Sequence, residues 1–487
     1  MREQHNHATA ASSVLIIGGG ITGLAAAFYL EQAAREAGIP LRCTIVERDA
    51  RFGGKIVTES VETPAGAFLV EGGPDSFVTQ KPAALALVRA LGLEAELLPT
   101  TPTPITTHFL IEGRPVAMPA GMSLIFPTEF GPFLASPLLS WQGRLRMLRE
   151  QWVPARTDGA DETLADFMRR RFGAEALDRL GEPLLAGIHS SDPEQQSMQM
   201  TFPRFLEMER THGSVIRALI AARRAREAAP ATATPAPPFL TLRGGIGTLV
   251  PALLKHLAAT LLPNRSVVAL AHDSAAAHPY RVRLNTGESL DADAVIVTTP
   301  ASAAAALLDT IEPGLAAPLR DIRYVSTATV SLAYPSAAIR APLEGFGLVI
   351  PQSEGRRINA LTITSKKFAG RAPDGYTLIR VFAGGARTPE TVALGDDAVL
   401  AIVRDELRSM LQIDAAPLWS RIFRWPNGHP QYAIGHKERV ASVEARLPAG
   451  LLLAGSSYRG VGLPDCIQQA QLAASAALEQ LRVPTLA

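Results

Sequence analysis

Cysteine is scarce in this chain of 487 residues, which holds only Cys43 and Cys466. Neither lies in a CxxC pair or at another metal-ligand spacing, and two cysteines do not make a disulfide framework. We therefore expect no disulfide and no metal site. No Ser-His-Asp or paired-carboxylate arrangement is evident either.

An excess of one charge is also missing. Lys and Arg number 47 against 46 for Asp and Glu, so the formal net charge is +1. Such a chain has no overall positive potential that would attract nucleic acid, so any anionic ligand must bind at a local cluster of positive or polar groups. No run of 18 or more apolar residues occurs, so no membrane-spanning helix is predicted. Residues 1–12 lack the apolar core of a secretory signal and are expected to be a disordered leader.

The chain does contain a strand, a glycine-rich turn and a helix in direct succession. The apolar residues 14–17 lead into a GxGxxG motif of Gly18, Gly20 and Gly23, and an alanine-rich helix continues to about residue 37. Gly18 allows the tight turn, Gly20 lets the backbone approach a pyrophosphate, and Gly23 lets the helix pack closely. The free N–H groups of the helix N-terminus would then bind phosphate.

A carboxylate follows at a suitable distance. Residues 41–47 predict a second strand that ends in Glu47. An acidic residue roughly 20 positions after the glycine motif reaches the ribose hydroxyls of a dinucleotide. Strand, turn, helix, strand and acid together predict a dinucleotide-binding βαβ unit rather than an ordinary glycine turn.

A glycine pair, Gly53 and Gly54, lies just beyond Glu47 and lets the chain fold back over an extended ligand. Two interpretations of the neighbouring Arg51 and Lys55 stay open. Either they face a phosphate or the edge of a ring system, or they are solvated surface charges.

Residues 72–75 form a second glycine-containing turn after a predicted strand. Gly72 and Gly73 lack Cβ atoms, so the backbone there can approach a flat ring, although a turn without a ligand is the alternative.

Near the C-terminus, small residues precede a helix whose first turn holds Pro464 and Asp465, a further helix N-terminus aimed at a ligand. Cys466 is expected to be a packed residue, with a reactive thiol as the alternative. Trp425 is expected to flank a ligand or to be a core aromatic.

Composition and periodicity divide the rest of the chain. Residues 82–228 predict a helical lobe, and residues 229–238 form an Ala/Pro/Thr-rich linker. Residues 301–440 predict a mixed-sheet substrate-binding domain. The fold class is α/β, with a discontinuous Rossmann-like domain made of residues 13–81, 239–300 and 441–487.

Residues 122–152 mix large apolar side chains with arginines. We interpret them as part of a helical lobe packed around an apolar substrate. Attachment to a bilayer surface is the alternative.

Six segments in order resemble the oxygen-dependent protoporphyrinogen oxidase family, which has an amine-oxidase-like flavoprotein fold. Within it, the chain is most similar to the soluble Gram-positive-type enzymes that oxidise coproporphyrinogen III. The resemblance extends from residue 14 to about residue 481. The segments are residues 18–23, 53–55, 71–77, 182–188, 430–436 and 460–466.

The resemblance implies FAD as the cofactor and no catalytic side chain, because the flavin does the chemistry. One of the implied FAD contacts falls on either Val267 or Val268, depending on the alignment register, and we assign it to Val267. Carried over position by position, the implied FAD contacts are Gly18, Gly19, Gly20, Ile21, Thr22, Gly23, Glu47, Lys55, Gly72, Gly73, Pro74, Asp75, Val267, Trp425, Val461, Gly462 and Leu463.

For the substrate, the resemblance implies that Lys81 meets a propionate and that Ile188 lines the cavity. Plant and animal relatives use an arginine where this chain has His108, which favours the bacterial type of site. The sequence leaves open which of four further basic residues face the cavity: Arg204, Arg210, Lys366 and Lys367.

The implied activity is the six-electron oxidation of coproporphyrinogen III to coproporphyrin III in haem biosynthesis, with oxygen as acceptor and release of hydrogen peroxide. Protoporphyrinogen IX is the alternative substrate. A flavin amine oxidase, a carotenoid desaturase and a non-catalytic flavoprotein are more distant alternatives. The expected partners are the porphyrinogen and oxygen, with a transient contact to the next haem-pathway enzyme left open. The expected location is the cytoplasm, with membrane contact at most peripheral, at the inner face.

Overall fold

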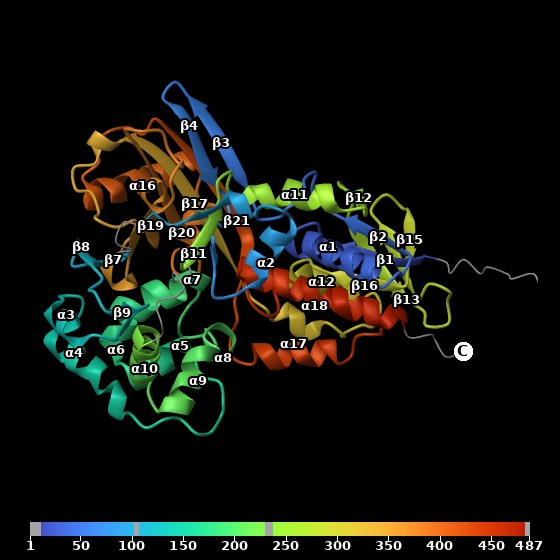
Figure 1. Cartoon of the computed structure of the whole chain (residues 1–487), viewed down its shortest axis with the longest axis horizontal. Coiled ribbons are helices and arrows are strands. Elements are labelled where there is room, and N and C mark those ends of the chain that lie inside the picture. The colour runs from blue at the N-terminus through green and yellow to red at the C-terminus, as the bar shows by residue number, and fades with distance from the viewer. Residues whose placement is uncertain (1–10, 102–106, 229–236, 483–487) are drawn as a thin grey trace, which may run out of the picture.

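The computed structural model describes residues 11–101, 107–228 and 237–482. The predicted leader therefore lies almost wholly outside the described residues, and so does most of the predicted linker, residues 229–236. Described residues form two halves joined near the middle of the molecule (Figure 1).

A parallel sheet forms the core of one half, in the order β12-β2-β1-β16-β22 (Figure 1). Every neighbouring pair in it is parallel. Its strands come from three distant stretches of the chain, as a discontinuous Rossmann-like domain requires. The strands are β1 (Ser12–Ile17), β2 (Leu41–Val46), β12 (Thr260–Leu262), β16 (Ala294–Val297) and β22 (Leu451–Leu453).

Both faces of this sheet are covered, which explains why its strands are apolar on both sides. On one face the alanine-rich α1 packs against α18, and α2 and α11 extend the same core. The other face packs against α12, α13, α17 and the antiparallel sheet β13-β14-β15. These elements are α1 (Ile21–Glu36), α2 (Ala83–Ala90), α11 (Leu249–His256), α12 (Ala301–Leu308), α13 (Ala317–Arg320), α17 (His436–Glu444), α18 (Leu463–Arg482), β13 (Val267–His272), β14 (Tyr280–Leu284) and β15 (Ser289–Ala292).

The second half holds a mixed sheet of seven strands in the order β21-β17-β20-β19-β18-β7-β8. Helix α16 (Asp396–Leu411) packs its apolar side on this sheet through Val399, Val403 and Leu407. The strands are β7 (Thr107–Ile111), β8 (Arg114–Ala117), β17 (Tyr324–Pro335), β18 (Gly347–Val349), β19 (Ala360–Ile363), β20 (Tyr376–Gly384) and β21 (Trp419–Pro430), with the short helices α14 (Thr364–Lys367) and α15 (Pro389–Ala393) at the margin.

Small sheets connect the two halves. The hairpin of β3 (Thr58–Thr63) and β4 (Gly66–Glu71) packs Phe68 and Val70 against the mixed sheet. A three-stranded sheet has the order β5-β11-β6 and comprises β5 (Phe77–Val78), β6 (Leu97–Pro99) and β11 (Phe239–Leu242).

Helices of the lobe surround a separate apolar core below the mixed sheet (Figure 1). A π-helical stretch, Leu177–Ala186, holds most of the segment 182–188 and has Pro183 inside it. The other helices and short strands of the lobe are β9 (Met122–Ser123), β10 (Phe126–Pro127), α3 (Phe130–Ala135), α4 (Trp141–Leu148), α5 (Leu164–Arg171), α6 (Ala174–Ala176), α7 (Gly187–His189), α8 (Met198–Thr201), α9 (Pro203–His212) and α10 (Val215–Ala228).

Two parts of the predicted organisation differ from the structure. The stretch 82–228 is not helical throughout, since β7 and β8 pair into the mixed sheet and α2 packs beside α18. Residues 301–322, expected in the substrate-binding domain, pack on the parallel sheet through Leu308, Leu315 and Leu319. Both differences arise from long-range packing, which local periodicity does not report.

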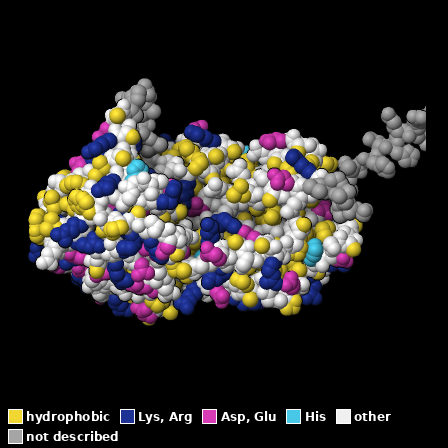
Figure 2. Space-filling model, turned by 90° about the horizontal axis from the view of Figure 1, so that it is seen from below, with side chains coloured by type: hydrophobic (Ala, Val, Ile, Leu, Met, Phe, Trp, Pro, Cys, Tyr) yellow, Lys and Arg dark blue, Asp and Glu magenta, His cyan; other side chains and the backbone are white. Residues whose placement is uncertain are grey.

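The apolar side chains of residues 122–152 divide into two groups. Phe126, Phe133 and Leu139 are buried in the lobe core, whereas Trp141 is 55% and Trp152 72% exposed. Figure 2 shows hydrophobic side chains gathered at the left end of the molecule, beside a band of Lys and Arg. No helix in the described ranges combines the length and apolar character that crossing a bilayer needs.

Candidate functional site

The glycine turn after β1 has the geometry of a phosphate cradle. Gly18 has a φ of +107° and its N–H donates to the Val46 carbonyl at 2.8 Å. A Cβ on Gly23 would lie 1.9 Å from the Gly18 carbonyl oxygen, so α1 can approach the turn only with glycine there. The first turn of α1 holds Ile21 and Thr22, which are uncharged. Its free N–H groups and the helix dipole therefore suit an anion.

Glu47 directly follows β2 and reaches this turn. Its carboxylate accepts hydrogen bonds from the Gly19 N–H at 2.6 Å and the Asp49 N–H at 2.8 Å. The Arg265 N–H donates to the Glu47 carbonyl at 2.9 Å, which brings the start of β13 beside it. Val267 is partly buried and packs against the core on that face of the parallel sheet, while Val268 is 47% exposed. The predicted ribose-binding acid and Val267 thus lie near one another.

The second glycine pair folds back onto the first turn. The Gly53 N–H donates to the Gly19 carbonyl at 2.8 Å. Arg51 donates to the Ile56 carbonyl at 3.0 Å and to that of Gly54, so its guanidinium fixes its own loop. Lys55 reaches across the molecule and donates to the Gly428 carbonyl.

Residues 72–75 are held tightly between the two halves. A Cβ on Gly73 would lie 1.8 Å from the Lys55 carbonyl oxygen, so the two segments touch at the backbone. The Gly72 carbonyl accepts from the Trp425 indole N–H at 3.0 Å and from Thr329 at 3.2 Å. Arg380 donates to the Gly73 carbonyl at 2.5 Å. Trp425 therefore joins this segment to β21.

Asp75 forms a buried ion pair with Lys367 at 2.9 Å. Burial alone would raise the pKa of Asp75, but the charges of Lys367 and Arg380 outweigh it and hold that pKa well below its usual value. The Lys367 ammonium is therefore already neutralised by the Asp75 carboxylate. This contradicts a role for Lys367 as a free propionate-binding residue.

The other basic candidates also have protein partners. Lys366 donates to the Leu343 carbonyl at 2.5 Å, and Arg210 pairs with Glu207 at 2.6 Å. Arg204 is exposed and donates to Gln80 at 3.4 Å. His108 is buried in β7.

The start of α18 meets residue 81. The Lys81 ammonium donates to both carboxylate oxygens of Asp465, at 2.7 and 2.8 Å. Asp465 follows Val461, Gly462 and Leu463, which places the predicted substrate lysine beside these predicted cofactor contacts. Lys81 remains half-exposed, so its charge is accessible from outside.

Cys466 lies in the same helical turn. It is buried and unbonded to Cys43, and burial raises the pKa of its thiol to about 11. The thiol is therefore neutral at physiological pH, which agrees with a packed residue.

Ile188 lies in α7, directly after the π-helical stretch, and is 52% exposed. Glu182 in that stretch pairs with Arg387 at 3.0 Å and accepts from the Gln352 N–H at 3.1 Å. The π-helical geometry tolerates Pro183, and such geometry is frequent at functional sites.

Hydrogen bonds link Glu47 to Gly19, Gly19 to Gly53, Gly72 to Trp425 and Lys81 to Asp465. The close approach of Gly73 to the Lys55 carbonyl brings the first and second glycine turns together. The donors fit an extended dinucleotide, with phosphate at α1 and a flat ring near Gly72 and the start of α18. Arg380 and Thr329 were not predicted, because they lie on strands that only folding brings to residue 72. In the described part of the chain no cluster of His, Cys, Asp and Glu could hold a metal ion.

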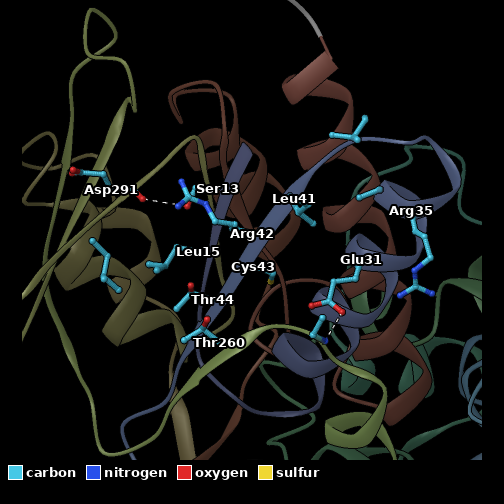
Figure 3. A pocket seen from close by; sticks show the side chains of 14 residues that line it. Ser13, Leu15, Glu31, Arg35, Leu41, Arg42, Cys43, Thr44, Thr260 and Asp291 are labelled. Atoms are coloured by element: carbon cyan, nitrogen blue, oxygen red, sulfur yellow. Dashed lines mark hydrogen bonds between the residues drawn. The ribbon is translucent and has the colours of Figure 1, made fainter. Parts of the chain in front are cut away.

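A separate pocket of about 610 Å³ lies where β1 and β2 begin (Figure 3). It is lined by residues that include Glu31, Arg42, Cys43 and Asp291. Ligands of open α/β sheets bind at the carboxyl ends of the strands, where the glycine turn lies. This pocket is therefore not part of the site.

Comparison with known proteins identifies relatives of the whole chain. The family of flavin-containing amine oxidoreductases matches residues 21–478. The coproporphyrinogen III oxidase of Bacillus subtilis (strain 168) is 37% identical over 472 residues, which cover 96% of this chain and 98% of the relative. The protoporphyrinogen oxidase of Bos taurus is 32% identical, with 96% and 98% covered.

Solved structures agree on the fold. A protein of Exiguobacterium sp. 255-15 that is assigned as a protoporphyrinogen oxidase superposes with a TM-score of 0.83 at 28% identity, covering 97% of this chain and all of that one. Putrescine oxidase bound to putrescine gives a TM-score of 0.68 at 15% identity, covering 96% of this chain and 99% of that one, which shows a shared fold alone.

Proposed function

Because the chain belongs to the flavin-containing amine oxidoreductase family, we propose that it is an FAD-dependent coproporphyrinogen III oxidase. The observation that carries the proposal is the nearly full-length similarity to bacterial coproporphyrinogen III oxidases. The linked site supports it, since its segments are those by which the sequence resembles porphyrinogen oxidases.

FAD is the cofactor that this family implies, and the residues present fit it. Residues 18–23 and the N-terminus of α1 would hold the pyrophosphate, and Glu47 the ribose. Residues 72–75, Trp425 and the start of α18 would hold the ring system. When bound, FAD supplies the removal of electron pairs from the substrate and their transfer to oxygen, with hydrogen peroxide as product.

The protein itself would bind and orient the substrate. Lys81 carries an accessible charge beside Asp465 of α18 and would meet a propionate of the porphyrinogen. Ile188 exposes an apolar side chain that would contact the macrocycle. Charge recognition at the edge and apolar contact along the ring would together fix which carbon faces the flavin.

Protoporphyrinogen IX is the alternative substrate, and it is supported by the similarity of the chain to protoporphyrinogen oxidases. Coproporphyrinogen carries four carboxylates and protoporphyrinogen two, so the former calls for more cationic or amide groups in the pocket. The greater identity to coproporphyrinogen III oxidases favours the four-carboxylate substrate. An amine oxidase is less well supported, since the structural likeness to putrescine oxidase concerns the fold alone.

The test is to compare initial rates on coproporphyrinogen III and protoporphyrinogen IX with the purified yellow protein. We expect oxygen consumption and hydrogen peroxide release with both, and a larger kcat/KM for coproporphyrinogen III. An equal or reversed preference would contradict the narrower assignment. Absence of turnover with either porphyrinogen would contradict the proposal as a whole.

We further propose that the enzyme acts in the cytoplasm, with any membrane contact peripheral. Trp141 and Trp152 are exposed, and the Arg144 guanidinium lies 5.4 Å from the centre of the Trp141 ring, which supports such a contact at the inner face. A transient contact with the enzyme that takes up the product is also proposed. Cell fractionation and co-sedimentation with anionic vesicles test the membrane contact.

A further inference from the structure

Two histidines have no part in the site described so far, and one of them, His189, lies near the predicted substrate lysine. His429 lies near the end of β21, and His189 closes α7. The Gln431 amide donates to the His189 carbonyl at 3.3 Å and to the His429 carbonyl at 3.4 Å, which ties the two segments together.

His429 has an unsatisfied polar atom. Its Nε2 is buried and has no hydrogen-bond partner among the described residues. A buried polar atom without a partner is costly in free energy, so such an atom in a folded protein calls for a bound group.

The charged groups that act on the two rings are positive. Lys55, which donates to the carbonyl of the residue before His429, is one neighbour, and Lys81 acts on His189. Asp465 is already paired with Lys81. No carboxylate in the described ranges forms an ion pair with Lys55, His189 or His429. The neighbouring Cys466 thiol is neutral because its pKa is raised.

This surrounding keeps both imidazoles neutral in the free protein. Burial and then the charge of Lys81 lower the pKa of His189 to about 4. Burial, then His189 and Lys55, lower the pKa of His429 to about 3. A carboxylate placed among these groups would reverse the balance, because it accepts hydrogen bonds and favours the protonated rings.

We propose that His429 and His189 form, between Lys55 and Lys81, a subsite that binds a carboxylate of the substrate. This inference rests on the proposed function. Coproporphyrinogen has two carboxylates that protoporphyrinogen lacks, and the subsite binds one of these two. His429 contributes to substrate specificity and to the orientation of the substrate, and it takes no part in the oxidation.

The test compares the His429→Leu holoenzyme with the wild type on both porphyrinogens. We expect the KM for coproporphyrinogen III to rise about tenfold, since one charge-assisted hydrogen bond is lost, while kcat and the KM for protoporphyrinogen IX change less than about twofold. His429→Gln keeps an N–H donor and should restore part of the affinity. His212→Leu, at an exposed position in α9, is the matched control.

A second measurement does not depend on turnover. Calorimetric binding of coproporphyrin III at pH ~6.5, in buffers of different ionisation enthalpy, should show uptake of about one proton by the wild type and less by His429→Leu. Flavin absorbance per protein and circular dichroism are recorded for each variant.

The outcomes are distinct. If the wild type oxidises coproporphyrinogen III but His429→Leu leaves its KM unchanged, or raises both KM values equally, the subsite is wrong and the proposed function stands. If His429→Leu loses FAD, the histidine serves the cofactor and the inference is overturned. If the wild type oxidises neither porphyrinogen, the proposed function itself fails.

Discussion

The carbonyl oxygen of Gly72 shows how single residues prepare this site. It accepts hydrogen bonds from Trp425, Thr329 and Arg380, at 3.0, 3.2 and 3.4 Å. These donors come from three neighbouring strands of the mixed sheet. The backbone that would face the flavin is therefore fixed by the far half of the molecule before any ligand binds, which reduces the ordering cost of binding.

At the same scale, Gly23→Ala should weaken FAD binding by about fivefold to about a hundredfold. The added methyl would lie 1.9 Å from the Gly18 carbonyl and force α1 away from the turn, at a cost of about 1–3 kcal/mol. Flavin absorbance per protein after gel filtration measures the loss. Gly131→Ala, whose methyl would meet nothing within 4 Å, is the control and should keep full flavin content.

Lys81→Ala should raise the KM for the porphyrinogen about tenfold, because a charge that meets a propionate is removed. Lys81→Arg should retain most of the affinity. Steady-state kinetics measure both, with the exposed Lys437→Ala in α17 as control. Unchanged KM and turnover in Lys81→Ala would count against a role for Lys81 in substrate binding.

Among the elements, the helical lobe depends on a buried ion pair. Arg171 at the end of α5 and Glu150 are both fully buried, and Glu150 also accepts from the Val215 N–H at 2.9 Å at the start of α10. Glu209 of α9 pairs with Arg171 at 3.1 Å. Arg171 thus joins α5 to α9 directly and to the start of α10 through Glu150, and the neighbouring Arg170 adds a second pair with Glu209 at 2.7 Å.

Arg171→Met should therefore lower the free energy of unfolding by about 3–5 kcal/mol, since it leaves Glu150 buried without its counter-charge. Arg169→Met, two residues earlier, removes an exposed pair with Glu194 and should cost less than about 1 kcal/mol. Urea unfolding of both variants gives the comparison. Equal losses would show that burial does not set the strength of these pairs.

The elements also show what the sequence could predict. The strand, turn and helix from Ser12 to Glu36 were predictable because their signals are local. Glu47 was predictable from spacing. The pairing of β7 with β18 was not, because the partner lies far along the chain and no local pattern reports it. For the same reason Arg380 and His429 carried no signal before folding placed them beside residues 72 and 189.

For the whole molecule, three histidines should make stability fall in acid. The pKa values of His189 and His436 are lowered to about 4 and that of His429 to about 3, mainly by burial. The unfolded chain takes up these protons first, so stability is complete above about pH 6.5 and is lost as the pH falls towards about 4. Each histidine contributes a slope of up to about 1.4 kcal/mol per pH unit.

Urea midpoints between about pH 7.5 and about pH 4.5 measure this slope. His436→Gln should flatten it, because His436 is fully buried and its titration is removed. His212→Gln, at an exposed position, should leave the profile unchanged. A His436→Gln profile parallel to that of the wild type would exclude His436 as a source of the acid sensitivity.

The parallel sheet takes strands from both ends of the chain, and α1 packs against α18. During translation, β1, the glycine turn and α1 leave the ribosome long before β22 and α18 are made. The nascent chain must therefore carry the exposed apolar faces of β1 and α1 through most of its synthesis. A messenger cut short before residue 451 would yield a polypeptide that holds the nucleotide motif intact but cannot close the sheet around it.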